Sequence, residues 1–339
     1  MRQAQAGHAP EMIWRARNRP VITCSTLWCP IPPEPVLSET NDKDRNARAD
    51  NGGGRIWLAL MPPAFVFLWS TGFVGARYGL PHVDPLTFVA LRLSLTAVIL
   101  TPIVVIWRAP WPSAWRDIRH IATAGILMNA VGLGGMFSAM GAGMPLAVVA
   151  LIGALQPLLT GLFSGALLDE RVSRKQWMGL TLGLGGVILV LWEKLGAGGV
   201  TPAGLVMATT GLLGFTSGTL YQKRFCATMN LRTGSAIQFL ASGGLMLALA
   251  SLIETRPIEW TTNLVLALFW LAIVLSIGAM TLLWLLVRRG AASKVASLFY
   301  LTPPVTALMA YGFFGETLGV LAIIGMAVAA YGVALVTRT

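Results

Sequence analysis

The sequence predicts an all-α polytopic membrane protein whose ten transmembrane helices form two inverted five-helix repeats. Hydrophobic residues make up 55% of the chain and charged residues only 12%, and the mean hydropathy is +0.69. Soluble domains carry roughly 25% charged residues, so this composition indicates a membrane protein. Long apolar blocks, without the short alternation of barrel strands, favour helices that satisfy their own backbone hydrogen bonds in lipid.

The chain contains one pattern twice, at a constant offset of 146 residues. The blocks 155–190 and 301–336 align without a gap. Their aligned proline, glutamate and glycine residues are Pro157 with Pro303, Glu170 with Glu316, and Gly179 with Gly325. Chance apolar similarity would not keep one register through these three residue types. The same offset pairs Gly72 with Gly218, so the repeat covers nearly everything after residue 55.

The first 55 residues lie outside this pattern. They contain six prolines, charges of both signs and a turn-forming Asn-Gly-Gly-Gly run, with no sustained helical period. We expect either a disordered cytoplasmic tail or an extension that follows from a wrongly chosen start codon. No secretory signal is predicted, because no apolar core of adequate length follows the early arginines. Cys24 and Cys29 lack a second Cys or His pair, so no zinc site is expected here.

Ten apolar segments follow this tail. They are expected at 56–77, 85–107, 118–139, 145–168, 175–192, 202–223, 233–253, 263–287, 292–315 and 318–337. The first five form one repeat, residues 56–192, and the other five form the second repeat, residues 202–337.

Local chemistry predicts several helix starts. Two spans begin with an N-cap residue followed by proline, at Asp84-Pro85 and Thr201-Pro202. Ser173 with Gln176 predicts a capping box at the start of the fifth span. Gly179 and Gly183, echoed by Gly325 and Ala329, predict that the fifth and tenth helices pack closely.

Basic residues are distributed unevenly over alternate loops. One set of loops carries Arg108, Arg116, Arg119, Arg171, Arg174, Lys175, Lys223, Arg224, Arg232, Arg288, Arg289 and Lys294, and the other set carries only Arg77, Lys194 and Arg256. Lys and Arg resist translocation, so the rich loops and both termini are predicted to be cytoplasmic. The net charge of +11 then reflects topology and the basic tail, and no nucleic-acid partner is predicted.

Five spans per repeat is an odd number, so the second repeat must enter the membrane from the opposite side to the first. Inverted repeats are typical of secondary transporters, in which two halves enclose a site at the membrane midplane and alternate between inward-open and outward-open states. The architecture therefore predicts a protein of the lipid bilayer that moves a small-molecule substrate.

Three parts of the sequence also resemble a known family. The strings FLWSTGFVGARYGLP (67–81) and DPLTFVALRLSL (84–95), with the two Pro-to-Glu blocks, are similar to the EamA-type branch of the drug/metabolite transporter (DMT) superfamily. The resemblance covers about residues 55–339. It implies two inverted five-helix bundles, a central substrate cavity and export of amino acids, metabolites or toxic compounds.

Arg92 is the only Asp, Glu, Lys, Arg or His well inside a predicted span. Such a group costs about 2.5–3.5 kcal/mol to insert, so it usually faces a protein interior or a wet cavity. The resemblance places an arginine in the same second-span context. Arg92 is therefore a candidate for the substrate cavity, and the alternative is that it snorkels outward or braces neighbouring helices. Its repeat partner, Gln238, is neutral.

The remaining cavity candidates are polar or aromatic residues within the spans. They are Trp69, Ser70, Thr71, Asn129, Gln156, Gln238, Tyr300 and Thr302, with Thr160, Ser217, Trp284 and Thr306 as further positions. Hydroxyls in membrane helices also bond to their own helix or to a neighbour, so each Ser and Thr has a structural alternative. Gln156 and Thr302 are favoured, because each precedes a proline that frees carbonyls one turn back.

Five residues are candidates for a helix break or a gate. They are Pro157, Pro303, Pro304, Glu170 and Glu316. The two glutamates end the fourth and ninth spans at opposite membrane faces. The alternative to a gate or a proton relay is a carboxylate that caps the next helix or pairs with a loop cation.

Missing motifs exclude several classes of protein. The chain has no G-x-x-x-x-G-K-[ST] and no H-E-x-x-H, and its three histidines lie outside the spans. We therefore predict no enzyme, no cofactor and no metal site. The hypothesis is a secondary transporter that exports amino acids or related toxic metabolites across the inner membrane by alternating access. The alternative is a membrane-integral enzyme or scaffold that handles lipid intermediates, and a homo-oligomer is left open.

Overall fold

The computed structural model describes residues 52–195, 200–314 and 319–338. The described residues are helical and contain no strand, which confirms the predicted fold class. The predicted tail lies almost entirely outside the described residues, as does Glu316.

The helices follow the predicted spans closely. In chain order they are α2 (Gly52–Gly79), η1 (Leu80–His82), α3 (Pro85–Ile106), α4 (Trp115–Gly125), η2 (Ile126–Leu133), α5 (Gly134–Gly141), α6 (Leu146–Gly153), α7 (Gln156–Leu168), α8 (Arg174–Leu195), α9 (Pro202–Phe225), α10 (Leu231–Ile253), α11 (Thr262–Trp270), η3 (Leu271–Ala279), α12 (Met280–Arg289), α13 (Ala292–Ser297), η4 (Leu298–Leu301), α14 (Thr302–Phe314) and α15 (Val320–Arg338).

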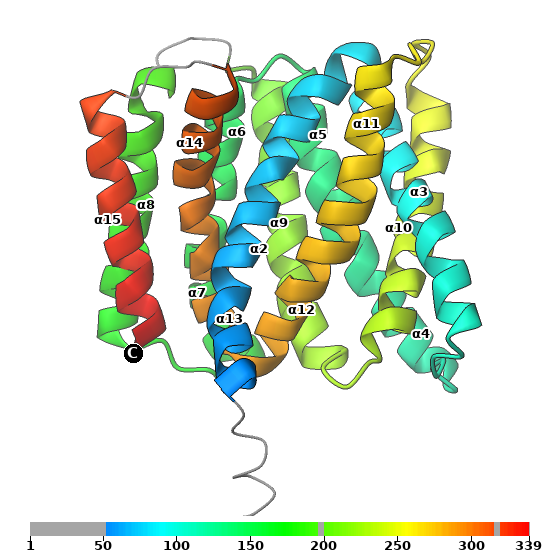
Figure 1. Ribbon diagram of the computed structural model, residues 1–339, viewed down its shortest axis with the longest axis horizontal. Coiled ribbons are helices and arrows are strands. Elements are labelled where there is room, and N and C mark those ends of the chain that lie inside the picture. Colours follow the sequence, from blue (N-terminus) through cyan, green and yellow to red (C-terminus); the bar gives the residue numbers. More distant parts are fainter. Residues whose placement is uncertain (1–51, 196–199, 315–318, 339) are drawn as a thin grey trace, which may run out of the picture. The chain divides into compact units, whose positions relative to one another are not determined.

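Nine helical stretches of the described residues are long and apolar enough to cross a membrane. The expected span at 292–315 is not among them, because it is divided into α13, the short 3-10 helix η4 and α14. The helices stand side by side as an upright bundle (Figure 1). We call the end at which α2 begins and α15 ends the terminal face, and the other end the opposite face.

The fourth and ninth spans are broken at equivalent positions. α6 ends at Gly153 and α7 begins at Gln156, while α13 passes through η4 before α14 begins at Thr302. Pro157 and Pro303 are the second residues of the new helices. A proline there costs no hydrogen bond, because the first turn has no intrahelical acceptor for its amide. The breaks lie at Pro157 and Pro303, two of the residues predicted as candidates for a helix break.

The third and eighth spans each contain a π-helical segment, η2 and η3. The two segments occupy equivalent positions of the two repeats, since the offset of 146 residues places Leu133 opposite Ala279. π-helical turns are rare and frequently lie at functional sites. Leu133 and Leu275, one from each segment, line the central cavity described below.

Glycines bring α8 and α15 together at one edge of the bundle (Figure 1). A Cβ atom on Gly186 would lie 2.4 Å from the amide nitrogen of Ala329, and one on Gly332 would lie 2.5 Å from that of Gly183. Only glycine fits where two backbones approach this closely. The predicted close packing of the fifth and tenth helices is therefore confirmed.

Two of the three predicted N-terminal caps form as expected, and the one at Asp84 does not. Thr201 accepts a hydrogen bond from Gly204, and Ser173 and Gln176 form the predicted capping box. Asp84 holds the N-cap position of α3 but accepts no capping bond. Glu254, at the end of α10, instead accepts the amides of Leu86 and Thr87 at 2.8 and 2.6 Å and the Thr87 hydroxyl at 2.7 Å. A distant carboxylate thus caps α3.

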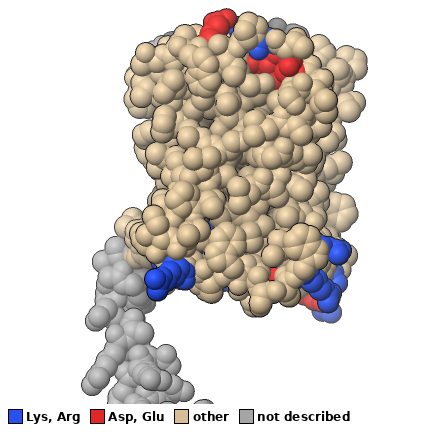
Figure 2. Space-filling view, turned by 90° about the vertical axis from the view of Figure 1, so that its right-hand side faces the viewer, with Lys and Arg blue, Asp and Glu red and all other residues tan. Residues whose placement is uncertain are grey.

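Charged side chains gather at the two ends of the bundle. In Figure 2, most of the visible Lys and Arg lie at the lower end, which is the terminal face, with a little acidic surface among them. Asp and Glu predominate at the upper end beside a small basic group, and an uncharged band lies between the two ends. An uncharged girdle of this kind fits the hydrocarbon of a bilayer. The exposed residues of the helices include large apolar side chains such as Phe67, Val98, Leu162 and Ile323.

Candidate functional site

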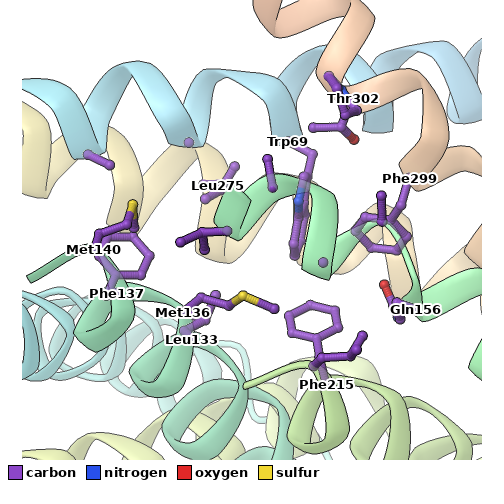
Figure 3. A pocket seen from close by; sticks show the side chains of 18 of the residues that line it. Trp69, Leu133, Met136, Phe137, Met140, Gln156, Phe215, Leu275, Phe299 and Thr302 are labelled. Carbon is purple, nitrogen blue, oxygen red and sulfur yellow. The ribbon is translucent and has the colours of Figure 1, made fainter. Parts of the chain in front are cut away.

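A central cavity of about 140 Å³ lies between the two repeats. Its lining residues are Trp69, Gly72, Ala76, Arg92, Leu133, Met136, Phe137, Met140, Val149, Ala150, Gly153, Ala154, Gln156, Leu212, Phe215, Leu275, Phe299, Thr302 and Pro303. In Figure 3, Trp69 stands in the middle of this set, with Phe299 and Gln156 on one side and Phe137 and Met140 on the other.

The cavity extends toward the opposite face. Ala76 and Met140 line it, and they lie in the last turns of α2 and α5 at that face. None of the lining residues lies in the first or last turn of a helix at the terminal face. Both repeats contribute to the wall, because α2 to α7 belong to the first and α9, η3 and α14 to the second.

Arg92 places a guanidinium in the cavity wall. Its side chain is 2% exposed, and its Nε donates a hydrogen bond to Ser276 Oγ at 3.1 Å. No carboxylate pairs with Arg92 within the part of the chain that the structure describes. Because α3 belongs to the first repeat and η3 to the second, this bond also ties the halves together. Arg92 therefore combines the two roles weighed from sequence, since it braces a neighbouring helix and also lines the cavity.

Gln156 and Thr302 contribute unpaired polar atoms from the two broken spans. Both side chains are buried and both line the cavity. Gln156 Nε2 and Thr302 Oγ1 have no hydrogen-bond partner among the described residues. An unsatisfied buried polar atom costs about 1–3 kcal/mol, so a ligand that supplies the missing partner gains binding energy here.

Aromatic side chains form the deep part of the wall. The Trp69 ring lies 5.1 Å from that of Phe299 and 5.6 Å from that of Phe215, both nearly edge-on. Phe65 contacts Trp69 at 5.5 Å and Phe299 at 5.3 Å without lining the cavity. These aromatic rings offer flat apolar surface to the body of a ligand.

Nine of the predicted cavity positions do not line the cavity. They are Ser70, Thr71, Asn129, Thr160, Ser217, Gln238, Trp284, Tyr300 and Thr306. Ser70 and Thr71 donate to carbonyls of Val66 and Leu68 on their own helix, as the structural alternative predicts. Gln238 donates to Gln222 at 2.6 Å. Polarity alone therefore did not distinguish a cavity position from a helix contact.

Asn129 and Tyr300 are deeply buried elsewhere in the bundle. Asn129 lies in η2 with neither amide atom paired among the described residues. Tyr300 packs against Gly183 of α8, where a Cβ atom would come within 2.4 Å of its ring. The sequence did not predict Met136, Phe137, Met140 and Phe215 as lining residues. The same apolar residue types face a cavity and face lipid, so the sequence does not distinguish the two.

Glu170 joins the two repeats at the terminal face, away from the cavity. Its Oε1 pairs with Lys223 Nζ, and its Oε2 accepts the amide of Ala292 at 2.9 Å. Lys223 also donates to the Gly290 carbonyl at 2.6 Å. Glu170 follows Asp169, whose φ of 56° ends α7 in the left-handed conformation. The carboxylate therefore pairs with a basic residue of a predicted loop, Lys223, as one alternative expected. It also caps α13 of the other repeat, rather than the next helix.

Comparison with known proteins assigns this chain to a family. The model of the EamA-like transporter family matches residues 56–192 and 202–338. The chain belongs to this family. It is therefore a multi-pass membrane protein of a transporter family within the DMT superfamily, and the predicted resemblance is confirmed.

Curated relatives of this EamA-family chain carry transporter names. The uncharacterized inner membrane transporter YedA of Escherichia coli strain K12 is 28% identical over 279 residues, which span 81% of this chain and 88% of YedA. A protein of Salmonella typhimurium strain LT2 named a probable amino-acid metabolite efflux pump is 27% identical over 272 residues, 77% of this chain and 87% of its own. A crystal structure matches with a TM-score of 0.70 at 23% identity, covering 82% of this chain and 96% of its own, which shows the fold alone.

Proposed function

We propose that this protein is a secondary transporter that exports a small organic metabolite across the inner membrane by alternating access. The observation that carries the proposal is the cavity built from both repeats around an arginine without a carboxylate partner among the described residues. Inverted repeats that share a central site can exchange conformations, which moves the opening from one face to the other.

The wall chemistry favours a substrate with an anionic group and an apolar body. Arg92 offers a charge-assisted, bidentate contact to a carboxylate. Trp69, Phe215 and Phe299 offer apolar and aromatic surface, and Gln156 and Thr302 supply two further polar contacts. A hydrophobic amino acid or a related zwitterion combines these features. The printed name of the Salmonella relative, an amino-acid metabolite efflux pump, supports the same class.

The contacts of Glu170 support a gate at the terminal face. This carboxylate joins the end of α7 in the first repeat to α9 and α13 in the second. The cavity lining meanwhile reaches the other end of the bundle. We propose that the structure represents the state open toward the opposite face. Given the loop charges, we also propose that the terminal face is cytoplasmic, with both termini inside.

A flux measurement tests the proposal. The purified full chain in proteoliposomes preloaded with unlabelled phenylalanine or leucine should accumulate the same labelled amino acid by counterflow. The corresponding amino-acid amides, which lack the carboxylate, should not exchange. Empty liposomes give the background. If no carboxylate of such a panel exchanges while the protein remains folded, the transport proposal fails, and movement of labelled lipid between leaflets would instead favour the lipid-handling alternative.

A further inference from the structure

A second pocket lies at the terminal face, separate from the central cavity. It has a volume of about 450 Å³. Its lining residues are Trp115, Arg116, Arg119, His120 and Thr123 of α4, together with Tyr221 of α9. The five α4 residues recur with the spacing of one helix face, so α4 presents a continuous basic and aromatic surface from its first turn into its third.

Two guanidinium groups in this pocket have no partner among the residues that the structure describes. Arg116 and Arg119 are exposed, and neither makes an ion pair or a side-chain hydrogen bond with the described residues. The nearby acidic residue, Asp117, does not line the pocket. The lining therefore holds two guanidinium groups and no carboxylate.

The back wall of the pocket is held in place by its own contacts. A hydrogen bond of 2.6 Å joins His120 Nδ1 to Tyr221 Oη. The His120 ring stacks on Phe225 with centroids 4.9 Å apart and an interplanar angle of 2°. Phe225 also lies beneath the Arg224 guanidinium. Because these rings are already packed, His120 and Tyr221 form an ordered wall beside the two guanidinium groups.

The surroundings place this pocket at the level of lipid headgroups. α4 begins at the terminal face (Figure 1), where Trp107, Trp111 and Trp115 are all exposed. Exposed tryptophans at the ends of spans lie at the membrane interface. Trp115, 69% exposed, thus gives the pocket an apolar edge toward the lipid beside its charged interior.

We propose that this pocket binds the phosphate headgroup of an anionic phospholipid. Arginine holds phosphate bidentately, and basic pockets between transmembrane helices on the cytoplasmic side bind anionic headgroups. A lipid is favoured over a free anion because the pocket lies at the membrane interface with an exposed indole at its edge. α4 belongs to the first repeat and α9 to the second, so a bound lipid bridges the halves. The proposal does not depend on the substrate proposed for the cavity.

Native mass spectrometry of the full chain in neutral detergent tests this site. Wild-type protein titrated with phosphatidylglycerol should retain one lipid more tightly than it retains phosphatidylcholine. The double variant Arg116→Gln/Arg119→Gln should bind phosphatidylglycerol about 25-fold more weakly, because each arginine near an anionic lipid is worth about fivefold. Binding of phosphatidylcholine should not change. Arg116→Lys/Arg119→Lys, which keeps both charges but loses the bidentate geometry, should recover only part of the affinity.

The matched control is Arg171→Gln/Arg174→Gln, which removes two exposed charges from the same face outside the pocket. It should retain wild-type affinity for phosphatidylglycerol. An equal loss in both double variants would overturn the proposal in favour of diffuse surface attraction. If millimolar inorganic phosphate displaces the retained lipid from wild type, the site takes free anions and the lipid assignment is wrong.

Discussion

Glu170 and Lys223 form an ion pair that joins the end of α7 to the end of α9, at the membrane face away from the cavity. Their side chains are only 22% and 18% exposed, so solvent screens the pair weakly. Each repeat contributes one partner. Opening the bundle at this face therefore requires the pair to separate.

Neutralising the carboxylate should loosen this closure. We expect Glu170→Gln to weaken the closed terminal face by about 1–3 kcal/mol, because Lys223 then keeps a part-buried charge without its partner. A cysteine at Ser297, buried in α13, should react faster with a thiol reagent applied from the terminal face.

Glu254→Gln serves as the control for the loss of a helix-capping carboxylate, because Glu254 caps α3 at the other face. It should not speed labelling at residue 297. Equal labelling rates in Glu170→Gln and the parent would show that the ion pair does not hold this face closed.

Substitutions of Arg92 should separate substrate binding from helix bracing. Arg92→Lys should weaken uptake of the carboxylate substrate, and Arg92→Gln should weaken it further, about 10- to 100-fold, since a hydrogen bond to a charged group is worth about 1.5–3 kcal/mol. Flux should be normalised to folded protein.

Ser276→Ala is the matched control, because it removes the hydrogen bond between Ser276 and the Arg92 side chain and keeps the charge. It should lower thermal stability more than normalised flux. Unchanged normalised flux in Arg92→Gln would exclude contact between Arg92 and the substrate.

Two neighbouring glycines of α8 should respond oppositely to the same substitution. Gly186→Ala should destabilise the protein by about 1–3 kcal/mol, because its new Cβ would meet the backbone of α15. Gly185→Ala should be neutral or stabilising by up to about 1 kcal/mol, since nothing lies within 4 Å of its added atom. Thermal unfolding in detergent measures both, and similar effects of the two would contradict the observed approach of the helices.

Thiol labelling of intact cells should report the orientation. With the terminal face in the cytoplasm, a cysteine at Thr255 or Asn263, exposed at the opposite face, should react with an impermeant reagent. Cysteines at Ser113 and Lys175, exposed at the terminal face, should react only after the cells are permeabilised. The reverse pattern would invert the proposed orientation.

Local signals in the sequence predicted most of the fold. Ser173 and Gln176 form a capping box between residues only three positions apart, so their spacing in the sequence was enough to predict it. The cap of α3 could not be predicted, because its acceptor, Glu254, comes from a distant helix. The π-helical segments were missed as well, since their residues are as apolar as those of an ordinary span.

The cavity was predicted only where the sequence departs from the lipid-facing pattern. Arg92 was found because a charge is rare in a membrane helix, and Gln156 and Thr302 because each is a polar residue directly before a proline that frees carbonyls. Gln238 carries the same kind of signal but bonds to Gln222 instead. Met136 and Phe215 carry no signal, because the direction in which an apolar side chain points depends on how the helices pack.

The equivalent positions of η2 and η3 have a consequence for the history of the chain. π-helical turns are rare, so two that arose independently at equivalent positions are less expected than one that was copied with the repeat. The shared position is most simply explained by a π-helical turn that was already present before the duplication that the sequence repeat implies. The ancestor would then have been a five-helix protein that already carried the wide turn. Two such chains, inserted in opposite directions, would enclose the same kind of cavity as a homodimer.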